Sequence, residues 1–172
     1  MLVLQLCRLG DILQTTPVLR RLRKAAPERE IDLVVTDNFS HVPIPTALFD
    51  RLHVFPRSQL RSMLAESPPD WTRPLALLRE FVGDVGRDPF DLAVNLTPDD
   101  TAGLFMSLVP ARKRCGMVMT PRRQHAVHGG WMQYFSATAR SRALRAFNLV
   151  DMYTWAAGVG CDDGSLEMSV PD

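Results

Sequence analysis

The first seventeen residues constrain the fold more than any other stretch of the chain. The apolar run from Leu2 to Leu6 is too short to cross a membrane and leads to a turn at Gly10, so it predicts a buried β-strand. From Ile12 onward apolar residues recur at helical spacing, with basic residues on the opposite side. A strand that leads into a helix through a Gly-Asp turn is the first unit of an α/β fold. Ligands in such folds bind beyond the carboxyl ends of the strands, and Asp11 is expected at that edge.

The rest of the chain repeats the alternation of strand and helix signals. Further strands are expected at residues 31–36, 52–55, 90–96 and 112–119, and helices at 58–65, 74–85 and 144–157, with another capped by Asp99 or Asp100. Two prolines between Asp37 and Leu48 allow only a short or broken helix there. Residues 120–143 are expected to be polar and irregular. This pattern predicts a mostly parallel sheet with helices on both faces.

Composition narrows the class of protein. With 172 residues, 46% of them hydrophobic, the chain can bury one ordinary core. The net charge of +1 gives no basic field for a nucleic-acid partner. Cys7, Cys115 and Cys161 are widely spaced and odd in number, which fits a reducing compartment. The N-terminus lacks the positive leader of a secretion signal, so we expect a cytoplasmic protein.

A family resemblance enters with the opening motif. Arg8-Leu-Gly-Asp11, followed by Ile-Leu-Gln-Thr-Thr-Pro17 and Leu19-Arg-Arg-Leu-Arg23, resembles the start of glycosyltransferase family 9. That family includes the bacterial heptosyltransferases of lipopolysaccharide core assembly. The resemblance continues in order through residues 30–35, 90–96, 111–116 and 147–151, with Gly158, and so spans nearly the whole chain.

The resemblance implies half of a two-domain GT-B enzyme. Residues 1–160 would form the N-terminal, Rossmann-like, acceptor-side domain, and residues 161–172 would begin the interdomain linker. The C-terminal donor-binding domain would be missing from this chain, because two such domains need about twice this length. We therefore expect the chain alone to be inactive.

The same resemblance implies inverting transfer of a sugar. The donor would be a nucleotide-sugar such as ADP-heptose, bound by the missing domain, and no cofactor is implied. The acceptor would be a glycan or lipid-linked glycan of the lipopolysaccharide-core type, with peripheral contact at the inner membrane face. No P-loop is present and no G-x-G-x-x-G follows a strand, so this chain is not expected to bind the nucleotide-sugar tightly.

Asp11 is the candidate general base. A carboxylate can take the proton of the acceptor hydroxyl, and in the family the aspartate of the Gly-Asp motif is the proposed base. The alternative is that Asp11 only caps a helix, in a capping box with Gln14. Pro17 requires either a kink in that helix or a main helix that begins at Pro17, with Thr16 as its cap.

Six further residues are candidates for acceptor binding, each with a structural alternative. The Arg8 guanidinium suits an anionic acceptor. Gly10 either lets the backbone approach the acceptor closely or forms a turn with positive φ. Hydroxyl and amide groups near the strand ends either bind sugar or serve as local caps and turns. The six are Arg8, Gly10, Thr15, Thr16, Asn95 and Thr97. Five more arginines are either acceptor contacts or solvated surface: Arg57, Arg112, Arg114, Arg122 and Arg123.

Other readings remain open at this stage. The chain is alternatively a non-catalytic α/β binding module that keeps the fold without the chemistry, or another small flavodoxin-like ligand-binding protein. His125-x-x-His128 lacks a supporting Cys, Asp or Glu pair, so a polar loop is favoured over a metal site. Gly158 is expected to end the last helix.

Overall fold

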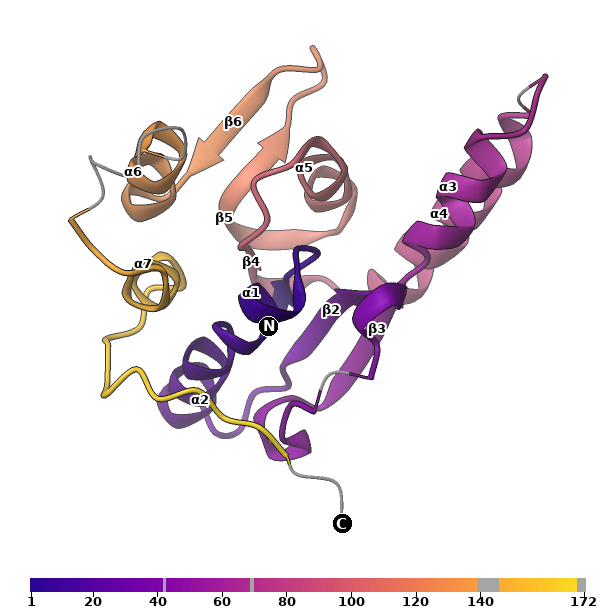
Figure 1. The fold of residues 1–172 in the computed structure, drawn as a ribbon. Helices are drawn as coiled ribbons and strands as arrows, with labels where there is room; N and C mark the ends of the chain where they lie inside the picture. The colour runs from indigo at the N-terminus through magenta and orange to yellow at the C-terminus, as the bar shows by residue number, and fades with distance from the viewer. Residues whose placement is uncertain (42, 69, 139–145, 170–172) are drawn as a thin grey trace.

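The computed structural model describes residues 1–41, 43–68, 70–138 and 146–169 (Figure 1). Its strands are β1 (Leu2–Leu4), β2 (Asp32–Thr36), β3 (Arg51–Phe55), β4 (Phe90–Asn95), β5 (Ala111–Met119) and β6 (His125–His128). Its α-helices are α1 (Leu9–Leu13), α2 (Thr16–Ala25), α3 (Arg57–Leu64), α4 (Thr72–Val85), α5 (Asp100–Leu108), α6 (Gly130–Thr138) and α7 (Leu149–Ala156). Two short 3-10 helices, η1 (Asp37–Phe39) and η2 (Thr46–Leu48), lie between β2 and β3.

The strands form one sheet in the order β3-β2-β1-β4-β5-β6. The first five run parallel and β6 pairs antiparallel to β5, so the predicted mostly parallel sheet is confirmed. This is the strand order of the doubly wound, Rossmann-like folds. β1 lies at the centre, and all three of its side chains are fully buried because helices cover both faces.

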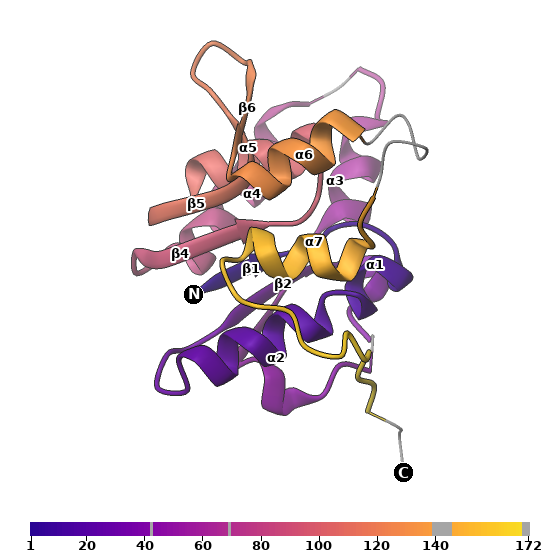
Figure 2. The same ribbon diagram turned by 90° about the vertical axis from the view of Figure 1, so that its left-hand side faces the viewer.

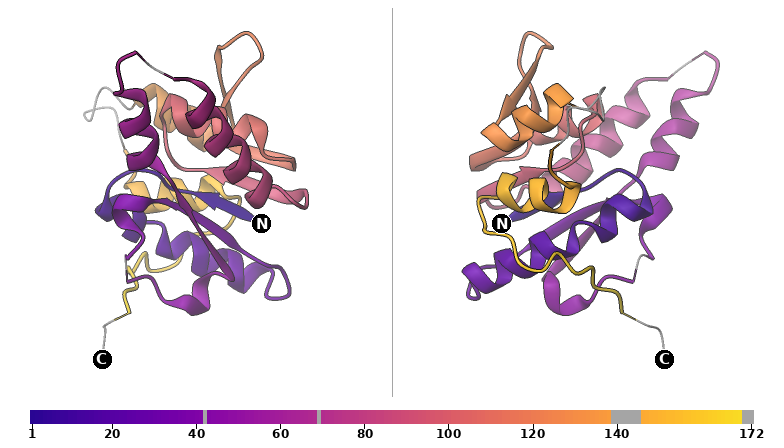
Figure 3. Two further views of the ribbon diagram at one scale, coloured as in Figure 1. Left: turned by 90° about the vertical axis from the view of Figure 1, so that its right-hand side faces the viewer. Right: turned by 60° about the vertical axis from the view of Figure 1, so that its left-hand side comes forward.

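Alternate side chains of the central strands enter two separate cores. Val3 packs with α2, α6 and α7 on one face, whereas Leu2 and Leu4 pack with α3, α4 and α5 on the other. Figures 1 and 2 show these two helical layers on either side of the sheet. The α3–α4 hairpin projects from the body of the molecule, as Figure 1 and the right view of Figure 3 show.

The first helical segment is interrupted, as Pro17 predicts. α1 has only five residues, and the main helix α2 begins at Thr16 with Pro17 in its first turn. A proline at that position loses no internal helical bond, because the first N–H groups of a helix have no partner. A new helix therefore does start beside Pro17, but it begins at Thr16, and Thr15 rather than the predicted Thr16 occupies the N-cap position.

Residues 120–138 are more regular than predicted. β6 folds back on β5 with Met119 opposite His125, and the turn between them contains Arg123 at φ 57. α6 follows at once. Trp131, Tyr134 and Phe135 belong to this helix and are spaced at its period. Residues 139–143 of the predicted irregular stretch lie outside the described residues.

The last helix is shorter than predicted. It begins at Leu149, where Asn148 precedes it and accepts a hydrogen bond from the Asp151 backbone N–H at 2.8 Å. Residues 144 and 145, at the predicted start, lie outside the described residues. Gly158 follows the helix at φ +77, which confirms its predicted role at the end. Within the described ranges, none of the helices has the length and apolar character needed to cross a membrane.

Candidate active site

The candidate site lies where the order of strands reverses along the sheet. The chain runs outward from β1 to β2 and β3, and then returns to the other side of β1 to form β4 and β5. The connections that leave β1 and β4 therefore diverge at the carboxyl edge, which is where open α/β sheets bind ligands. The Leu96 backbone N–H bonds to the Leu4 carbonyl at 3.0 Å, so the two strands stay paired up to this switch point.

A buried polar network joins the ends of β1 and β4 beneath the surface of the switch point. The Gln5 side-chain oxygen accepts hydrogen bonds from the Thr97 hydroxyl and the Cys7 backbone N–H, both at 3.2 Å. The Thr97 hydroxyl accepts one from the Leu6 N–H at 2.7 Å, and Asn95 Oδ1 accepts one from the Thr97 N–H at 2.9 Å. Gln5, Asn95 and Thr97 are fully buried. Because its polar groups are paired, the network holds the ends of β1 and β4 in one arrangement.

Four residues predicted to contact an acceptor sugar lie beneath the surface instead: Thr15, Thr16, Asn95 and Thr97, each with 0% of its surface exposed. The Thr15 hydroxyl donates to the Asp11 carbonyl at 2.9 Å, and the Thr16 hydroxyl donates to the Leu13 carbonyl at 2.8 Å. These bonds satisfy backbone groups around the break between α1 and α2. The four side chains therefore position the elements that carry the site rather than line its surface.

Asp11 is the third residue of α1, and one carboxylate oxygen takes part in capping that helix. Asp11 Oδ2 accepts a hydrogen bond from the backbone N–H of Arg8, the N-cap residue, at 3.1 Å. The predicted capping box with Asp11 as the cap and Gln14 as its partner is therefore wrong by three residues. In the described part of the chain, Asp11 Oδ1 has no hydrogen-bond or ion-pair partner. The half-buried side chain thus combines capping with one uncommitted oxygen at the switch point.

Arg8 and Gly10 flank Asp11 and are exposed. Gly10 lies inside α1 without a positive φ, so the alternative of a left-handed turn is wrong. A Cβ placed on Gly10 would meet no atom within 4 Å, which means that the space above this residue is open. The Arg8 guanidinium makes no ion pair with any residue that the structure describes, so it is available to an anionic ligand.

Cys7, which the sequence offers only as an isolated thiol, lies close enough to charged groups of this edge for them to shift its pKa. Burial, followed by the Asp11 and Asp99 carboxylates, raises the pKa of the Cys7 thiol to about 11, against the opposing effects of the Thr97 hydroxyl and the Arg57 guanidinium. The thiol is therefore protonated at neutral pH and is unsuited to act as a nucleophile. The reactivity of this thiol instead reports the charges that surround it.

The five remaining arginines lie in different parts of the sheet and its connections. Arg57 Nη1 donates to the Leu6 carbonyl at 3.0 Å and so lies at the switch point. Arg112 pairs with Asp91 at 3.3 Å, at the opposite edge of the sheet. Arg114 donates to backbone carbonyls at the end of α5, including that of Val109, which gives it a structural role. Arg122 and Arg123 lie exposed in the β5–β6 turn, which follows the carboxyl end of β5.

The histidine pair lies on a strand at the edge of the sheet. His125 and His128 belong to strand β6 rather than to the predicted loop, and His125 Nε2 lies 3.0 Å from Asp100 Oδ1. Across the ranges that the structure describes, no three His, Cys, Asp or Glu side chains are grouped so that they could hold a metal ion.

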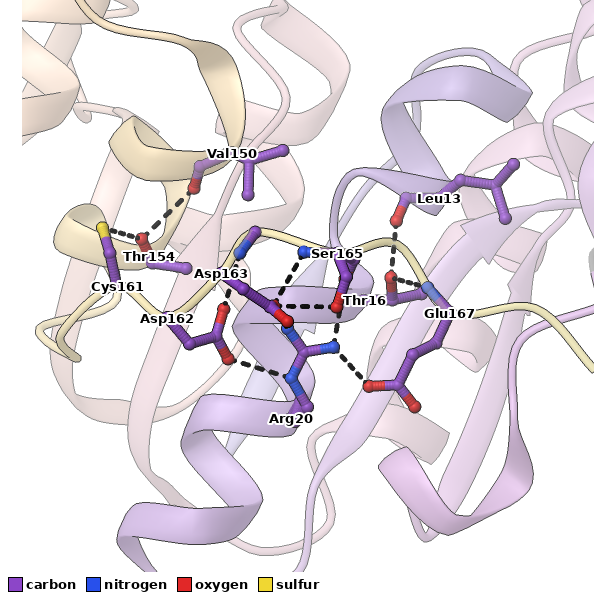
Figure 4. Close-up of polar contacts among 11 residues, drawn as sticks. Leu13, Thr16, Arg20, Val150, Thr154, Cys161, Asp162, Asp163, Ser165 and Glu167 are labelled. Carbon is purple, nitrogen blue, oxygen red and sulfur yellow. Dashed lines mark hydrogen bonds and ion pairs between the residues drawn. The ribbon is translucent and has the colours of Figure 1, made fainter.

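The segment after α7 is fixed along α2 near the site (Figure 4). Arg20 Nε bonds to Asp162 Oδ2 at 2.9 Å, and Arg20 Nη1 bonds to the Ser165 carbonyl at 3.0 Å and to Glu167 Oε1 at 2.5 Å. The Glu167 N–H donates to the Thr16 hydroxyl at 3.0 Å. Residues 161–169, part of the segment predicted to begin a linker, are neither helix nor strand, and these contacts bind them to α2.

Comparison with known proteins places this arrangement in a known fold. No protein-family model matches the sequence, and no curated protein matches it. Among solved structures, E. coli heptosyltransferase WaaC with ADP-2-deoxy-2-fluoro heptose aligns at a TM-score of 0.64 and 16% identity, over 94% of this chain and 49% of that one. The glycosyl transferase family 9 from Veillonella parvula DSM 2008 aligns at a TM-score of 0.70 and 21% identity, over 99% of this chain and 45% of that one. The fold is that of a glycosyltransferase.

WaaC with ADP gives the same TM-score of 0.64 at 16% identity, over 94% of this chain and 48% of that one. The chain thus spans about half the length of the glycosyltransferases that it matches. At these identities the likeness concerns the fold, and it agrees with the expected α/β architecture of a GT-B enzyme.

Proposed function

We propose that this chain is the N-terminal, acceptor-binding half of an inverting glycosyltransferase. Its partner would be a donor-binding domain that holds a nucleotide-sugar such as ADP-heptose, and the acceptor would be a glycan or lipid-linked glycan of the lipopolysaccharide-core type. The observation that carries the proposal is the Asp11 carboxylate, half-buried at the switch point with one oxygen uncommitted among the described residues. The donor assignment is supported by the ligands named for the E. coli WaaC structures.

Asp11 would act as the general base. The acceptor hydroxyl oxygen attacks the anomeric carbon of the donor sugar, and Asp11 Oδ1 takes the hydroxyl proton as the new C–O bond forms. The bond between the anomeric carbon and the diphosphate breaks, and the nucleoside diphosphate leaves with its electron pair. A positioned base of this kind contributes about 10²–10⁴-fold to the rate.

The neighbours of Asp11 would have distinct roles. The bond from the Arg8 N–H fixes one carboxylate oxygen and so orients the other. The open space above Gly10 would admit the acceptor, and the exposed Arg8 guanidinium would pair with an acidic group on it. Thr15, Thr16, Asn95 and Thr97 would act as positioning residues, because they are buried and bonded to the backbone around the site.

We place the reaction in the cytoplasm. All three cysteines, Cys7, Cys115 and Cys161, are free, and Cys115 is buried. A protein that carries only free thiols fits a reducing compartment.

The acceptor half of this proposal can be tested on the chain itself by NMR titration. A phosphorylated core-type oligosaccharide is expected to shift the backbone amides of residues 7–15 and 97–101. Amides of residues 84–91, at the opposite edge of the sheet, serve as the internal control and are expected to stay unchanged. Shifts confined to the control edge, or none at any edge, would contradict acceptor binding at the switch point.

The donor half is tested by calorimetric titration with ADP-heptose. The chain is expected to show no tight binding, because it carries no phosphate-binding signature of the P-loop or G-x-G-x-x-G type. Clear micromolar binding of ADP-heptose by residues 1–172 would overturn the assignment of this chain to the acceptor side.

A further inference from the structure

An apolar groove of about 480 Å³ runs between the α3–α4 hairpin and α5. A groove of this size falls within the roughly 300–1,000 Å³ of ordinary small-molecule sites. Its lining is leucine-rich and includes Leu60, Leu64, Trp71, Leu75, Leu104 and Leu108. None of the described lining residues is acidic.

The groove gathers large apolar side chains that are unusually exposed. Trp71 and Leu75 expose 60% and 61% of their surface, although both belong to the hairpin that packs against the apolar core. Leu108, on the facing helix α5, exposes 54%. A contiguous set of such residues marks a binding surface, whereas scattered ones are ordinary.

The charged groups of the groove are both basic. Arg57 and Arg61 line it, and neither makes an ion pair with a carboxylate in the part of the chain that the structure describes. Arg57 also bonds to the Leu6 carbonyl just beyond the end of β1, so this side chain links the groove to the connection that carries Asp11. A ligand that fits these surroundings has a hydrocarbon chain, a negative group and a polar part directed toward Asp11.

We propose that this groove binds the hydrocarbon chain of an anionic lipid-linked acceptor, with the acidic group of the lipid held by Arg57 and Arg61. The inference rests on the proposed function and specifies its substrate as a single lipid molecule in a groove. A concave surface lined on two sides by α4 and α5 suits one chain, whereas a bilayer would contact a convex or flat apolar patch.

The first test measures binding of monoalkyl phosphates, from hexyl to dodecyl, to the 172-residue chain below their micelle concentrations. Burial of each methylene stabilises by about 0.8 kcal/mol, which corresponds to about fourfold in Kd, so affinity should rise about fourfold per methylene until the groove is filled. Dodecyl trimethylammonium, which has the opposite charge, should bind at least about tenfold more weakly. An affinity that does not depend on chain length would overturn the proposal.

Matched variants locate the binding. Leu75→Gln and Leu104→Gln should each weaken dodecyl phosphate at least about tenfold, and their exposed positions should leave thermal unfolding close to wild type. Either variant alone suffices if the other fails to fold. Leu166→Gln, at a position 49% exposed in the tail, is the control and should bind as wild type does. Arg61→Gln should remove most of the preference for phosphate over the cationic amphiphile.

Other occupants of the groove predict different results. Binding to phosphatidylglycerol vesicles without binding to monomeric alkyl phosphate would identify a bilayer contact and overturn the proposal. Dimerisation that Leu75→Gln abolishes, without alkyl phosphate binding, would identify an interface with a second copy and would also overturn it.

The groove and the proposed function can fail separately. In the two-domain enzyme, Leu75→Gln should lower kcat/KM for a lipid-linked acceptor more than for the same acceptor without its chain, whereas Asp11→Asn should reduce turnover of both. Equal losses on the two acceptors with Leu75→Gln would reject the groove and leave the proposed function standing. Alkyl phosphate binding by the chain, together with full turnover in Asp11→Asn, would reject Asp11 as the base of the proposed function and leave the groove as a lipid-binding site.

Discussion

The Asp11 carboxylate accepts a hydrogen bond from the Arg8 backbone N–H at 3.1 Å, at the start of the short helix that follows the central strand. This bond fixes the side chain in one orientation without using both of its oxygens. A group at a helix N-terminus is therefore not restricted to capping, because a carboxylate can serve the backbone with one oxygen and a ligand with the other. The predictions below follow from this edge of the sheet.

Two glycines near the site should respond in opposite ways to alanine. Gly116 has φ +95, and a Cβ there would lie 2.0 Å from the Asn95 carbonyl oxygen, so Gly116→Ala should lower the free energy of unfolding by about 3–5 kcal/mol. Gly10 is helical with open space around it, so Gly10→Ala should leave stability unchanged or raise it by up to about 1 kcal/mol. Urea denaturation measures both. A destabilising Gly10→Ala would show that this helix is not placed as described.

Cys7 should report the charge on Asp11. Its pKa of about 11 should make alkylation by iodoacetamide at pH 8 more than about 100-fold slower than that of a free thiol. Asp11→Asn should accelerate the reaction several-fold, because it removes a carboxylate that raises this pKa, whereas Asp84→Asn should not. Peptide mass spectrometry resolves Cys7 from the other thiols. Equal alkylation rates in wild type and Asp11→Asn would show that the Asp11 carboxylate does not raise the pKa of the Cys7 thiol.

The same raised pKa predicts a pH dependence of stability. The folded state holds the Cys7 proton more tightly than the unfolded state, whose thiol has a pKa of about 8.5. The contribution to stability is therefore complete below about pH 8.5 and is lost as the pH rises toward 11. Cys7→Ser should flatten this part of the stability curve.

Arg20 should hold the segment after α7 on α2. Arg20→Gln removes bonds to Asp162, Ser165 and Glu167, so it should cost about 1–2 kcal/mol and speed hydrogen exchange at residues 164–167. Arg87→Gln is the matched control, because Arg87 is more exposed and its one ion pair among the described residues is with Asp84. Its effect should stay within about 0.5 kcal/mol. Unchanged exchange in Arg20→Gln would mean that other contacts hold the segment.

The first strand and helices could be predicted because sequence and packing agree there. Leu2 to Leu4 form an uninterrupted apolar run for a strand buried on both faces, and Pro17 fits only the first turn of a helix. The strand order places Asp11 at the switch point, and the position of Asp11 after the first strand is enough to predict that it lies at the carboxyl edge.

Burial of the polar residues could not be predicted. Thr15 and Thr97 have the side chains of ligand-binding residues, yet they are fully buried because Gln5 and the strand ends supply their partners. Gln5 is a polar residue between Leu4 and Leu6 in an otherwise apolar run. A polar side chain at a position expected to be buried was the one sequence signal of a buried hydrogen-bond network. β6 and α6 were missed because polar residues dominate 120–130 and the pairing of β6 with β5 is a tertiary contact.

The direct test of the central claim is turnover by Asp11→Asn in the two-domain enzyme that we propose this chain to serve. Asn keeps the shape of the side chain and an oxygen that can accept the Arg8 N–H, so the variant should fold and bind both substrates. It cannot take the acceptor proton, so kcat should fall by about 10²–10⁴-fold. A kcat close to that of wild type would contradict the account and would leave Asp11 with its capping role alone.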